Sequence, residues 1–422
     1  MDQSFNRATL ARCLISKDFY IDDNLNDETY RRNLIDQALN LAKDGNNFTP
    51  NLSVDTSSKK PVYSVNNLVE KLVLRKCAKN IRSAAKIRIK PRTKIIREIK
   101  SFLKEGTPYR IYRLDIHSFF ENCHSGNIID IFQKYKISTQ TELLLTKFLA
   151  NFNSVYSAGI PRGIETSPIL SELSLIDFDS IISGLEEAYY YSRFVDDIFI
   201  ITSGEENKGE FLKRVRRALP KGLKLNHNKT TIIDIPKRSK GIPACTVAKL
   251  DYLGYSFSVI DTDLSLIYPN TAIDKLKGVT KVEYREVLID LTSKKINRIM
   301  EKVTKAFYSN SKCNDYQLLT DRLVFLSTNR NLINKVKNRA IPTGIYYSHS
   351  EIDFPSMSLK RLDNFLNKMI HTPQGRIGGV ISGQLSKAQK KQLSKISFSN
   401  GHNKRVFKRY SPNRLGTISS IW

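Results

Sequence analysis

The chain has 422 residues, which allows one large domain or two to three ordinary ones with a complete hydrophobic core. Its 68 lysine and arginine residues against 41 aspartate and glutamate residues give a net charge of +27, and such a surplus favours a polyanionic partner such as nucleic acid over a membrane surface. The apolar residues, 40% of the chain, form no run that approaches the length of a membrane span, so no membrane-spanning helix is expected.

The cysteines and the first residues indicate a cytoplasmic protein. The five cysteines are scattered, odd in number and form no CxxC pair, so the sequence predicts neither a disulfide framework nor a zinc site. The polar stretch Met1–Arg7 lacks the apolar core of a signal peptide. We therefore expect reduced thiols and no structural metal.

The N-terminal 60 residues are expected to form a small helical extension. A periodic apolar pattern predicts a helix over residues 30–42. Residues 46–60 are rich in Asn, Ser, Thr and Pro, a composition typical of a loop. No residue type here points to chemistry.

Residues 66–106 predict two basic amphipathic helices separated by Pro91, the second over residues 93–103. Basic residues cluster around this break. Arg92 and Arg97 are our candidates for a cationic clamp on a triphosphate, and the alternative for both is a solvated helix face.

Asp115 ends an apolar strand and is followed by the aromatic pair Phe119-Phe120. A carboxylate at the end of a buried strand needs a partner. It is either a helix cap or salt-bridge residue, or a member of a larger cluster. Further on, the turn at residues 159–163, Gly-Ile-Pro-Arg-Gly, requires close backbone approach before a helix that begins at Ser167.

The apolar runs on both sides of Asp196-Asp197 predict a β-hairpin with two adjacent carboxylates at its tip. Like charges so close repel, and a divalent cation with oxygen ligands, such as magnesium, would relieve the repulsion. With Asp115 they would form the three-carboxylate cluster that two-metal phosphoryl transfer uses. The alternative is a solvated Asp-Asp turn.

Beyond the hairpin the sequence predicts a further short strand pair, then helices and a basic tail. Gly254, within Tyr252–Tyr255, indicates a bulge or a close backbone approach. Amphipathic helices are expected over residues 291–307 and 358–370. The tail from residue 398 interleaves aromatic and basic residues, a composition that suits single-stranded nucleic acid or a solvated, partly ordered segment.

The order of these segments resembles the reverse transcriptase family across residues 66–258. Four patterns occur in the family's order, and Lys229 stands where a fifth has its lysine. The four are Leu114-Asp115-Ile116-His117-Ser118-Phe119-Phe120, Gly159-Ile160-Pro161-Arg162-Gly163 through Ser167-Pro168, Phe194-Val195-Asp196-Asp197, and Tyr252-Leu253-Gly254-Tyr255.

The resemblance implies an α/β (α+β) right-hand polymerase fold with fingers, an antiparallel-sheet palm and a helical thumb, plus a helical C-terminal extension. The expected divisions are 1–60 for the N-terminal extension, 61–265 for fingers and palm, 266–345 for the thumb, and 346–422 for the basic helical extension.

The resemblance also implies the catalytic groups. Asp115 and Asp196 would hold two Mg²⁺ ions together with the backbone carbonyl of Ile116, and Asp197 would support the second carboxylate position. One ion would lower the pKa of the primer 3′-hydroxyl, and the other would neutralise the triphosphate and the leaving pyrophosphate.

Further residues are assigned to the nucleotide and the primer by the same resemblance. Phe120 would crowd a 2′-hydroxyl and select deoxynucleotides, its alternative being a core phenylalanine. Arg162 and Gly163 would contact the nucleotide, although the family commonly has glutamine at Arg162. Lys229 would approach the pyrophosphate, or else is a solvated lysine. Tyr252, Leu253, Gly254 and Tyr255 would grip the primer strand.

Within the family the chain most resembles bacterial defence-associated and abortive-infection reverse transcriptases, including the type three defence system, which pairs two reverse transcriptases with a noncoding RNA. The expected function is RNA-directed DNA synthesis on a bound noncoding RNA during antiphage defence. The expected partners are RNA template, DNA primer or product, deoxynucleotide triphosphates, and a second reverse transcriptase subunit or another copy of the chain. Alternatives are a retron- or intron-type reverse transcriptase, or a non-catalytic RNA-binding scaffold.

Overall fold

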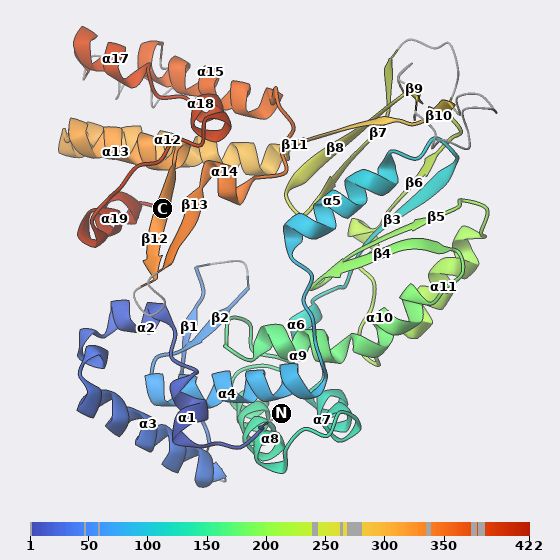
Figure 1. Ribbon diagram of the computed structural model, residues 1–422, viewed down its shortest axis with the longest axis vertical. Coiled ribbons are helices and arrows are strands. Elements are labelled where there is room, and N and C mark those ends of the chain that lie inside the picture. The colour runs from blue at the N-terminus through green and yellow to red at the C-terminus, as the bar shows by residue number, and fades with distance from the viewer. Residues whose placement is uncertain are drawn as a thin grey trace, which may run out of the picture. The chain divides into compact units, whose positions relative to one another are not determined.

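The computed structural model describes residues 2–45, 48–57, 60–238, 244–261, 265–267, 281–334, 339–372, 378 and 385–422 (Figure 1). Its contacts divide the chain into two compact units. Unit 1 comprises Met1–Pro91 and Thr107–Lys237, and unit 2 comprises Arg92–Gly106 and Arg238–Trp422. The boundaries expected for fingers, palm and thumb stay predictions, and residues 268–280 and 335–338 of the expected thumb lie outside the described residues.

Unit 1 contains a helical N-terminal part followed by a sheet with its covering helices. Its helices and short 3-10 segments are α1 (Arg7–Ala11), α2 (Ser16–Ile21), η1 (Asp23–Asn26), α3 (Glu28–Lys43), α4 (Leu68–Ala84), α6 (Phe119–Asn122), α7 (Ser125–Lys134), α8 (Thr139–Val155), α9 (Ser167–Ser174), α10 (Ile176–Ser183), α11 (Lys208–Ala218) and η3 (His227–Lys229). Its strands are β1 (Leu52–Asp55), β2 (Val62–Val65), β3 (Tyr109–Asp115), β4 (Ala188–Phe194), β5 (Asp197–Thr202) and β6 (Thr231–Ile235).

The main sheet of unit 1 has four antiparallel strands in the order β4-β5-β3-β6. Residues Ile198–Ile201 of β5 are all buried, as expected for a central strand covered on both faces. In Figure 1, α10 and α11 run along one side of this sheet. The ring of Tyr112 on β3 packs 4.7 Å from Phe211 on α11, which fixes the sheet against its helices.

The expected loop over residues 46–60 is wrong in part, because residues 52–55 form β1. They pair antiparallel with β2 in a two-stranded sheet. The apolar side chains Leu52, Tyr63 and Val65 are buried, and the Tyr63 ring lies 4.9 Å from Phe152 of α8. This short hairpin has too few apolar residues for a sequence pattern to reveal its strands. The same residues are enough to stabilise the hairpin once they pack against α8.

Unit 2 combines a three-stranded sheet with a group of helices. Its helices are α5 (Arg92–Leu103), α12 (Ser293–Cys313), α13 (Tyr316–Ser327), α14 (Ile345–Ser348), α15 (Met357–His371), α17 (Lys387–Leu393), α18 (Phe398–Asn403) and α19 (Pro412–Ser419). Its strands are β7 (Cys245–Tyr252), β8 (Tyr255–Asp261), β9 (Ser265–Ile267), β10 (Lys281–Glu283), β11 (Glu286–Leu291), β12 (Asn329–Asn334) and β13 (Arg339–Gly344). The sheet order is β11-β8-β7, and the expected helices at 93–103, 291–307 and 358–370 are confirmed by α5, α12 and α15.

The basic tail folds back on unit 2. Arg414 pairs with Asp321 of α13, and the indole nitrogen of Trp422 donates to the Lys302 carbonyl at 3.2 Å. The rings of Tyr410 and Trp422 pack near Phe325, with centroids 6.3 and 5.5 Å away. These two aromatic residues therefore contribute to internal packing. None of the helices in the described part of the chain has the length and apolar character that crossing a membrane requires.

Candidate active site

The Asp-Asp pair lies at the tip of the β4–β5 hairpin. Phe194 pairs with Asp197 in the strand register, so Val195 and Asp196 form a two-residue turn. Val195 has φ +58°, a left-handed conformation that a β-branched residue rarely adopts. Such strain persists only where the surroundings hold it, and it is concentrated at functional sites.

Asp115 lies directly beside this turn, because its strand β3 pairs with β5. Asp115 is opposite Asp197 in the register, and the next amide, of Ile116, donates to the Asp196 carbonyl at 3.1 Å. The structure therefore brings together the three carboxylates that were far apart in sequence. We call Asp115, Asp196 and Asp197 the carboxylate cluster.

Two polar side chains from the segment before β6 hold Asp115, which is 5% exposed. Lys229 Nζ donates to one of its oxygens at 2.8 Å, and Asn226 Nδ2 donates to the other at 3.1 Å. The backbones of the same two residues are also joined, since the Asn226 amide donates to the Asp115 carbonyl at 2.7 Å. Lys229 was expected near the cluster, whereas Asn226 was missed because an asparagine in a turn has no distinguishing sequence signal.

The electrostatics of the cluster favour an added cation. Burial and then the neighbouring Asp196 raise the pKa of Asp197 to about 6. Burial raises the pKa of Asp196 as well, and Asp115 adds to the effect. The hydrogen bond to Asp115 raises the pKa of Lys229. Carboxylates whose charged forms are disfavoured by each other are stabilised when a metal ion binds between them.

The donor set of the cluster suits magnesium in chemical type. Carboxylate and carbonyl oxygens are the hard ligands that Mg²⁺ takes, usually few in number and completed by water and phosphate. Among the described residues, no group of three or more Asp, Glu, His or Cys side chains is arranged so that it could hold a metal ion. Asp115 and Asp196, with the Ile116 carbonyl, supply the ligand types that would hold the ion once water and phosphate complete its coordination.

The glycine turn packs against the residues that follow Asp115. Gly159 has φ +97°, and a Cβ there would lie 2.2 Å from the Phe120 carbonyl oxygen. Gly163 has φ +100°, and a Cβ there would lie 2.6 Å from the Tyr63 carbonyl oxygen. Both positions therefore require glycine, as the sequence indicated.

Arg162 lies over the half-buried Phe120. Its guanidinium carbon is 4.6 Å from the ring centroid, and an Nη atom donates to Glu121 at 3.2 Å. The other Glu121 oxygen pairs with Lys60 at 3.0 Å. Glu121 and Lys60 were missed by sequence reasoning, because nothing in the pattern links positions 60, 121 and 162.

The remaining predicted site residues lie in unit 2. Arg92 donates to the Ser348 carbonyl at 2.6 Å and lies over the Tyr255 ring, while Arg97 pairs with Glu351 at 2.7 Å. Tyr252 and Tyr255 are each 1% exposed and flank the β7–β8 turn, where Leu253 and Gly254 have positive φ. The triphosphate clamp and the primer grip stay predictions.

A cavity of about 440 Å³ in unit 2 was not foreseen. We call it the cation-lined cavity, because its described lining contains basic residues and no carboxylate; the basic residues are Arg92, Lys295, Arg298, Lys302 and Arg330. Burial lowers the pKa of Lys295 and of Lys302, and neighbouring cations add to the effect. The basic residues along 291–307 were visible in the sequence, but not that they line one hollow together with Arg92 and Arg330.

Comparison with known proteins identifies the family. The family model described as reverse transcriptase (RNA-dependent DNA polymerase) matches residues 47–257, half of the chain. No curated protein matches the sequence.

Solved structures similar to this chain include telomerases from Candida. The apo telomerase of Candida tropicalis, truncated from its C-terminal domain, is 16% identical over 44% of this chain and 42% of that chain, with a TM-score of 0.31. The telomerase of Candida albicans, in complex with a TWJ fragment of telomeric RNA, is 10% identical over 83% of this chain and 53% of that chain, with a TM-score of 0.32. The chain thus spans about half or less of the length of these structures.

The family match covers all four sequence patterns that suggested the resemblance, and the observed antiparallel sheet carries two of them at its strand ends. The predicted right-hand polymerase fold class is confirmed. The chain belongs to the reverse transcriptase (RNA-dependent DNA polymerase) family.

Proposed function

We propose that this protein is an RNA-directed DNA polymerase that adds deoxynucleotides to a primer end by phosphoryl transfer. The observation that carries the proposal is the convergence of Asp115, Asp196 and Asp197 at one end of the unit 1 sheet. Phosphoryl transfer needs positioning and charge neutralisation more than a nucleophilic side chain, and a carboxylate cluster serves both needs. A scaffold without catalysis would have no use for three carboxylates gathered at one place, two of them with a pKa raised by burial and by neighbouring carboxylates.

In the proposed mechanism, Asp115 and Asp196 would hold magnesium ions with the Ile116 carbonyl, and Asp197 would support the second carboxylate position. Bound magnesium would acidify the primer 3′-hydroxyl and neutralise the triphosphate. Lys229, whose Nζ donates to Asp115 at 2.8 Å, would act as a cation or as a proton donor toward the leaving pyrophosphate.

Phe120 is proposed to select the sugar. Its ring contacts the Phe119 ring, with a centroid distance of 5.4 Å, and the Arg162 guanidinium, 4.6 Å from the centroid. These two contacts restrict the movement of the ring away from an added hydroxyl group. Discrimination against a 2′-hydroxyl is then steric.

The net charge of +27 and the cation-lined cavity support nucleic acid as the polyanionic partner. We propose that basic side chains of unit 2 contact the phosphates of an RNA template and its DNA product. The side chains with lowered pKa have the most to gain from a phosphate, because its charge offsets the repulsion among neighbouring cations.

The narrower setting that we propose rests on the sequence resemblance. It is synthesis on a bound noncoding RNA during bacterial antiphage defence, in the cytoplasm, with a second reverse transcriptase subunit or another copy of the chain. Sequencing the nucleic acid that purifies with the protein tests this setting: one defined RNA species supports it, and random cellular RNA contradicts it.

A primer-extension assay tests the activity. Purified protein is given RNA template, DNA primer, Mg²⁺ and either deoxynucleotides or ribonucleotides, with and without its co-purified RNA. We expect deoxynucleotide incorporation that Asp196→Ala abolishes. Failure of the wild-type protein to extend any primer, or to label itself in the absence of one, would favour the scaffold.

The same assay tests the sugar filter through Phe120→Ala. Removing the ring is expected to reduce discrimination against ribonucleotides by about 10- to 100-fold. Phe132→Leu, a change in a buried ring on α7, is the matched control and should leave sugar selection intact. Unchanged selection in Phe120→Ala would remove the role given to this ring.

A further inference from the structure

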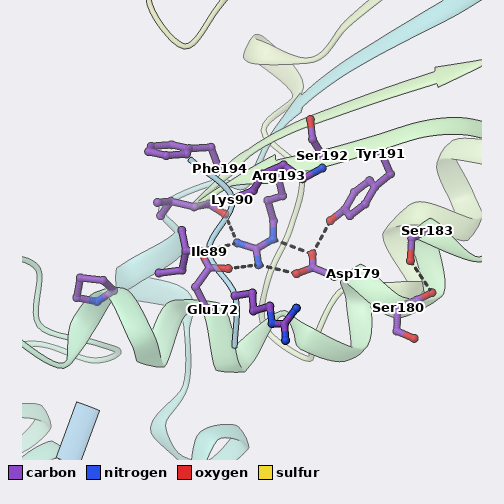
Figure 2. Close-up of a pocket in the computed structure, with 13 residues that line it drawn as sticks. Ile89, Lys90, Glu172, Asp179, Ser180, Ser183, Tyr191, Ser192, Arg193 and Phe194 are labelled. Atoms are coloured by element: carbon purple, nitrogen blue, oxygen red, sulfur yellow. Dashed lines mark hydrogen bonds and ion pairs between the residues drawn. The ribbon is translucent and has the colours of Figure 1, made fainter. Parts of the chain in front are cut away.

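Arg193, three residues before the catalytic Asp196, is buried in a network of charged side chains. Its side chain is 3% exposed and lies between Glu172 of α9 and Asp179 of α10 (Figure 2). Its Nε and one Nη donate to the two Asp179 oxygens at 2.8 and 2.7 Å. Nη2, which also binds Asp179, donates to one Glu172 oxygen at 2.8 Å, and Nη1 donates to the other at 3.3 Å. The Tyr191 hydroxyl also donates to Asp179.

One further hydrogen bond connects this network with the active-site turn. The Nη1 of Arg193 donates to the Val195 carbonyl at 2.9 Å. Val195 is the residue at φ +58°, and its carbonyl belongs to the peptide that joins it to Asp196. The next carbonyl, of Asp196, accepts from the Ile116 amide at 3.1 Å. Two successive peptides of the turn are therefore held, one by a buried guanidinium and the other by β3.

A structural ion pair alone would not require this arrangement. Burying one guanidinium needs a carboxylate partner, and Asp179 alone already supplies a bidentate one. The bond to Val195 instead directs a donor to a backbone carbonyl in an unfavourable turn. Because a lysine has one compact ammonium group, it cannot reach both carboxylates and that carbonyl at once.

The network borders a cavity of about 440 Å³, whose lining includes Arg88, Lys90, Pro168, Arg193 and Val195. The helices α9 and α10 thus contact the turn through Arg193 at the edge of a space that can hold a small molecule. Truncating Arg193 to alanine would enlarge this space by more than the volume of a guanidinium group.

We propose that Arg193 is a positioning residue that holds the Val195–Asp196 peptide so that the Asp196 carboxylate stays aligned with Asp115. The inference rests on the proposed function, because it assigns Arg193 a part in the same reaction. Removing a group that orients a metal ligand without touching the metal typically lowers metal affinity or activity by about 10- to 100-fold.

The test compares Arg193→Lys and Arg193→Ala with the wild-type protein in two readouts. The first is Mn²⁺ affinity of the nucleotide-free protein by calorimetry, with Mn²⁺ standing in for Mg²⁺. The second is the kcat and KM of primer extension. We expect Mn²⁺ affinity and kcat to fall about 10- to 100-fold in both variants, with the KM for deoxynucleotides changed far less.

Chemical rescue gives a sharper measurement. Millimolar guanidinium should enter the space left in Arg193→Ala and restore kcat and Mn²⁺ affinity several-fold. Arg214→Ala is the matched control, since Arg214 pairs with Glu187 at the surface of the same unit. This variant should keep the wild-type kcat and Mn²⁺ affinity, and added guanidinium should change neither.

Wild-type Mn²⁺ affinity and kcat in folded Arg193→Lys would overturn the proposal. If Arg193→Ala does not fold, Arg193→Lys decides alone, with circular dichroism to verify its fold. Wild-type protein that binds Mn²⁺ without extending any primer would contradict the proposed function, whereas weaker Mn²⁺ binding by Arg193→Lys would still support the positioning role.

Discussion

The carboxylate cluster of unit 1 gathers three acidic side chains at the end of a sheet, whereas the cation-lined cavity of unit 2 gathers five basic ones beside α12. In the first region, like charges help to raise the pKa of Asp196 and Asp197. In the second, like charges help to lower the pKa of Lys295 and Lys302. Each region therefore keeps an excess of charge of one sign, although Lys229 pairs with one of the three carboxylates in the first region.

This difference in sign indicates what each region can bind. A divalent cation would relieve the first region and phosphate groups the second. A polymerase needs both, since it holds metal ions at the reacting atoms and the nucleic-acid backbone elsewhere. Four experiments test the comparison, from the largest expected effect to the smallest.

Removing one carboxylate of the cluster is expected to have the largest effect on the reaction. We expect Asp196→Ala to lower the rate of incorporation by about 10³-fold, because several kcal/mol of transition-state stabilisation are lost with the metal site. Single-turnover primer extension measures the rate. Glu210→Ala, an exposed carboxylate paired with Lys213 on α11, is the control and should retain wild-type activity. Equal rates in Asp196→Ala and in this control would exclude the cluster as the reaction centre.

Removing positive charge should weaken the second region's interaction with nucleic acid. The double change Lys295→Gln and Arg298→Gln is expected to lower RNA affinity about 10-fold at moderate salt, and to reduce the slope of log K against log salt by about one for each phosphate that is no longer bound. Titration at several salt concentrations measures both. Lys312→Gln, in the last turn of the same helix, is the control, and an unchanged slope in the double variant would show that no phosphate binds there.

The repulsion among the carboxylates of the first region should make the stability of the metal-free protein depend on pH. The folded-state pKa of Asp197, about 6, exceeds its ordinary value of 3.8, so its contribution to stability is present below pH 3.8 and is lost as pH rises through about 6. Asp197→Asn should therefore gain about 2–4 °C in melting temperature over wild type between pH 4 and pH 7, in EDTA. Excess Mg²⁺ should shrink that gain at pH 7. An equal difference between the two proteins at both pH values would contradict the charge argument.

His349 provides the corresponding test in the second region. Burial, with Lys295 and Arg92 nearby, lowers its pKa to about 3 from an ordinary 6.5. Its contribution to stability is therefore present above pH 6.5 and is lost as pH falls toward 3. We expect wild type to lose about 2 °C more in melting temperature than His349→Gln between pH 7.5 and pH 6. Parallel pH curves would mean that the pKa of His349 is the same in the folded and unfolded protein, and would contradict the effect of burial.

Local sequence patterns were sufficient to predict the strand ends that carry the candidate catalytic carboxylates. Apolar runs that stop at Asp115 and at Asp196 are local features, and strand pairing follows from them with few alternatives. Glycine at 159 and 163 was also locally determined, because only a residue without Cβ fits a positive φ beside another backbone. The family, the antiparallel sheet and the candidate catalytic carboxylates could therefore be predicted from local patterns and their order along the chain.

Contacts between positions that are distant along the chain depend on the tertiary structure and could not be predicted from local patterns. The bond from Arg193 to Val195, with Glu172 and Asp179 behind it, depends on how α9 and α10 pack against β4. The β1–β2 hairpin, and the partners of Arg92 and Arg97 within unit 2, likewise depend on surfaces that other segments supply. The physical reason is that strand and turn preferences act over a few residues, whereas the partner of a charged side chain is set by packing of the whole unit.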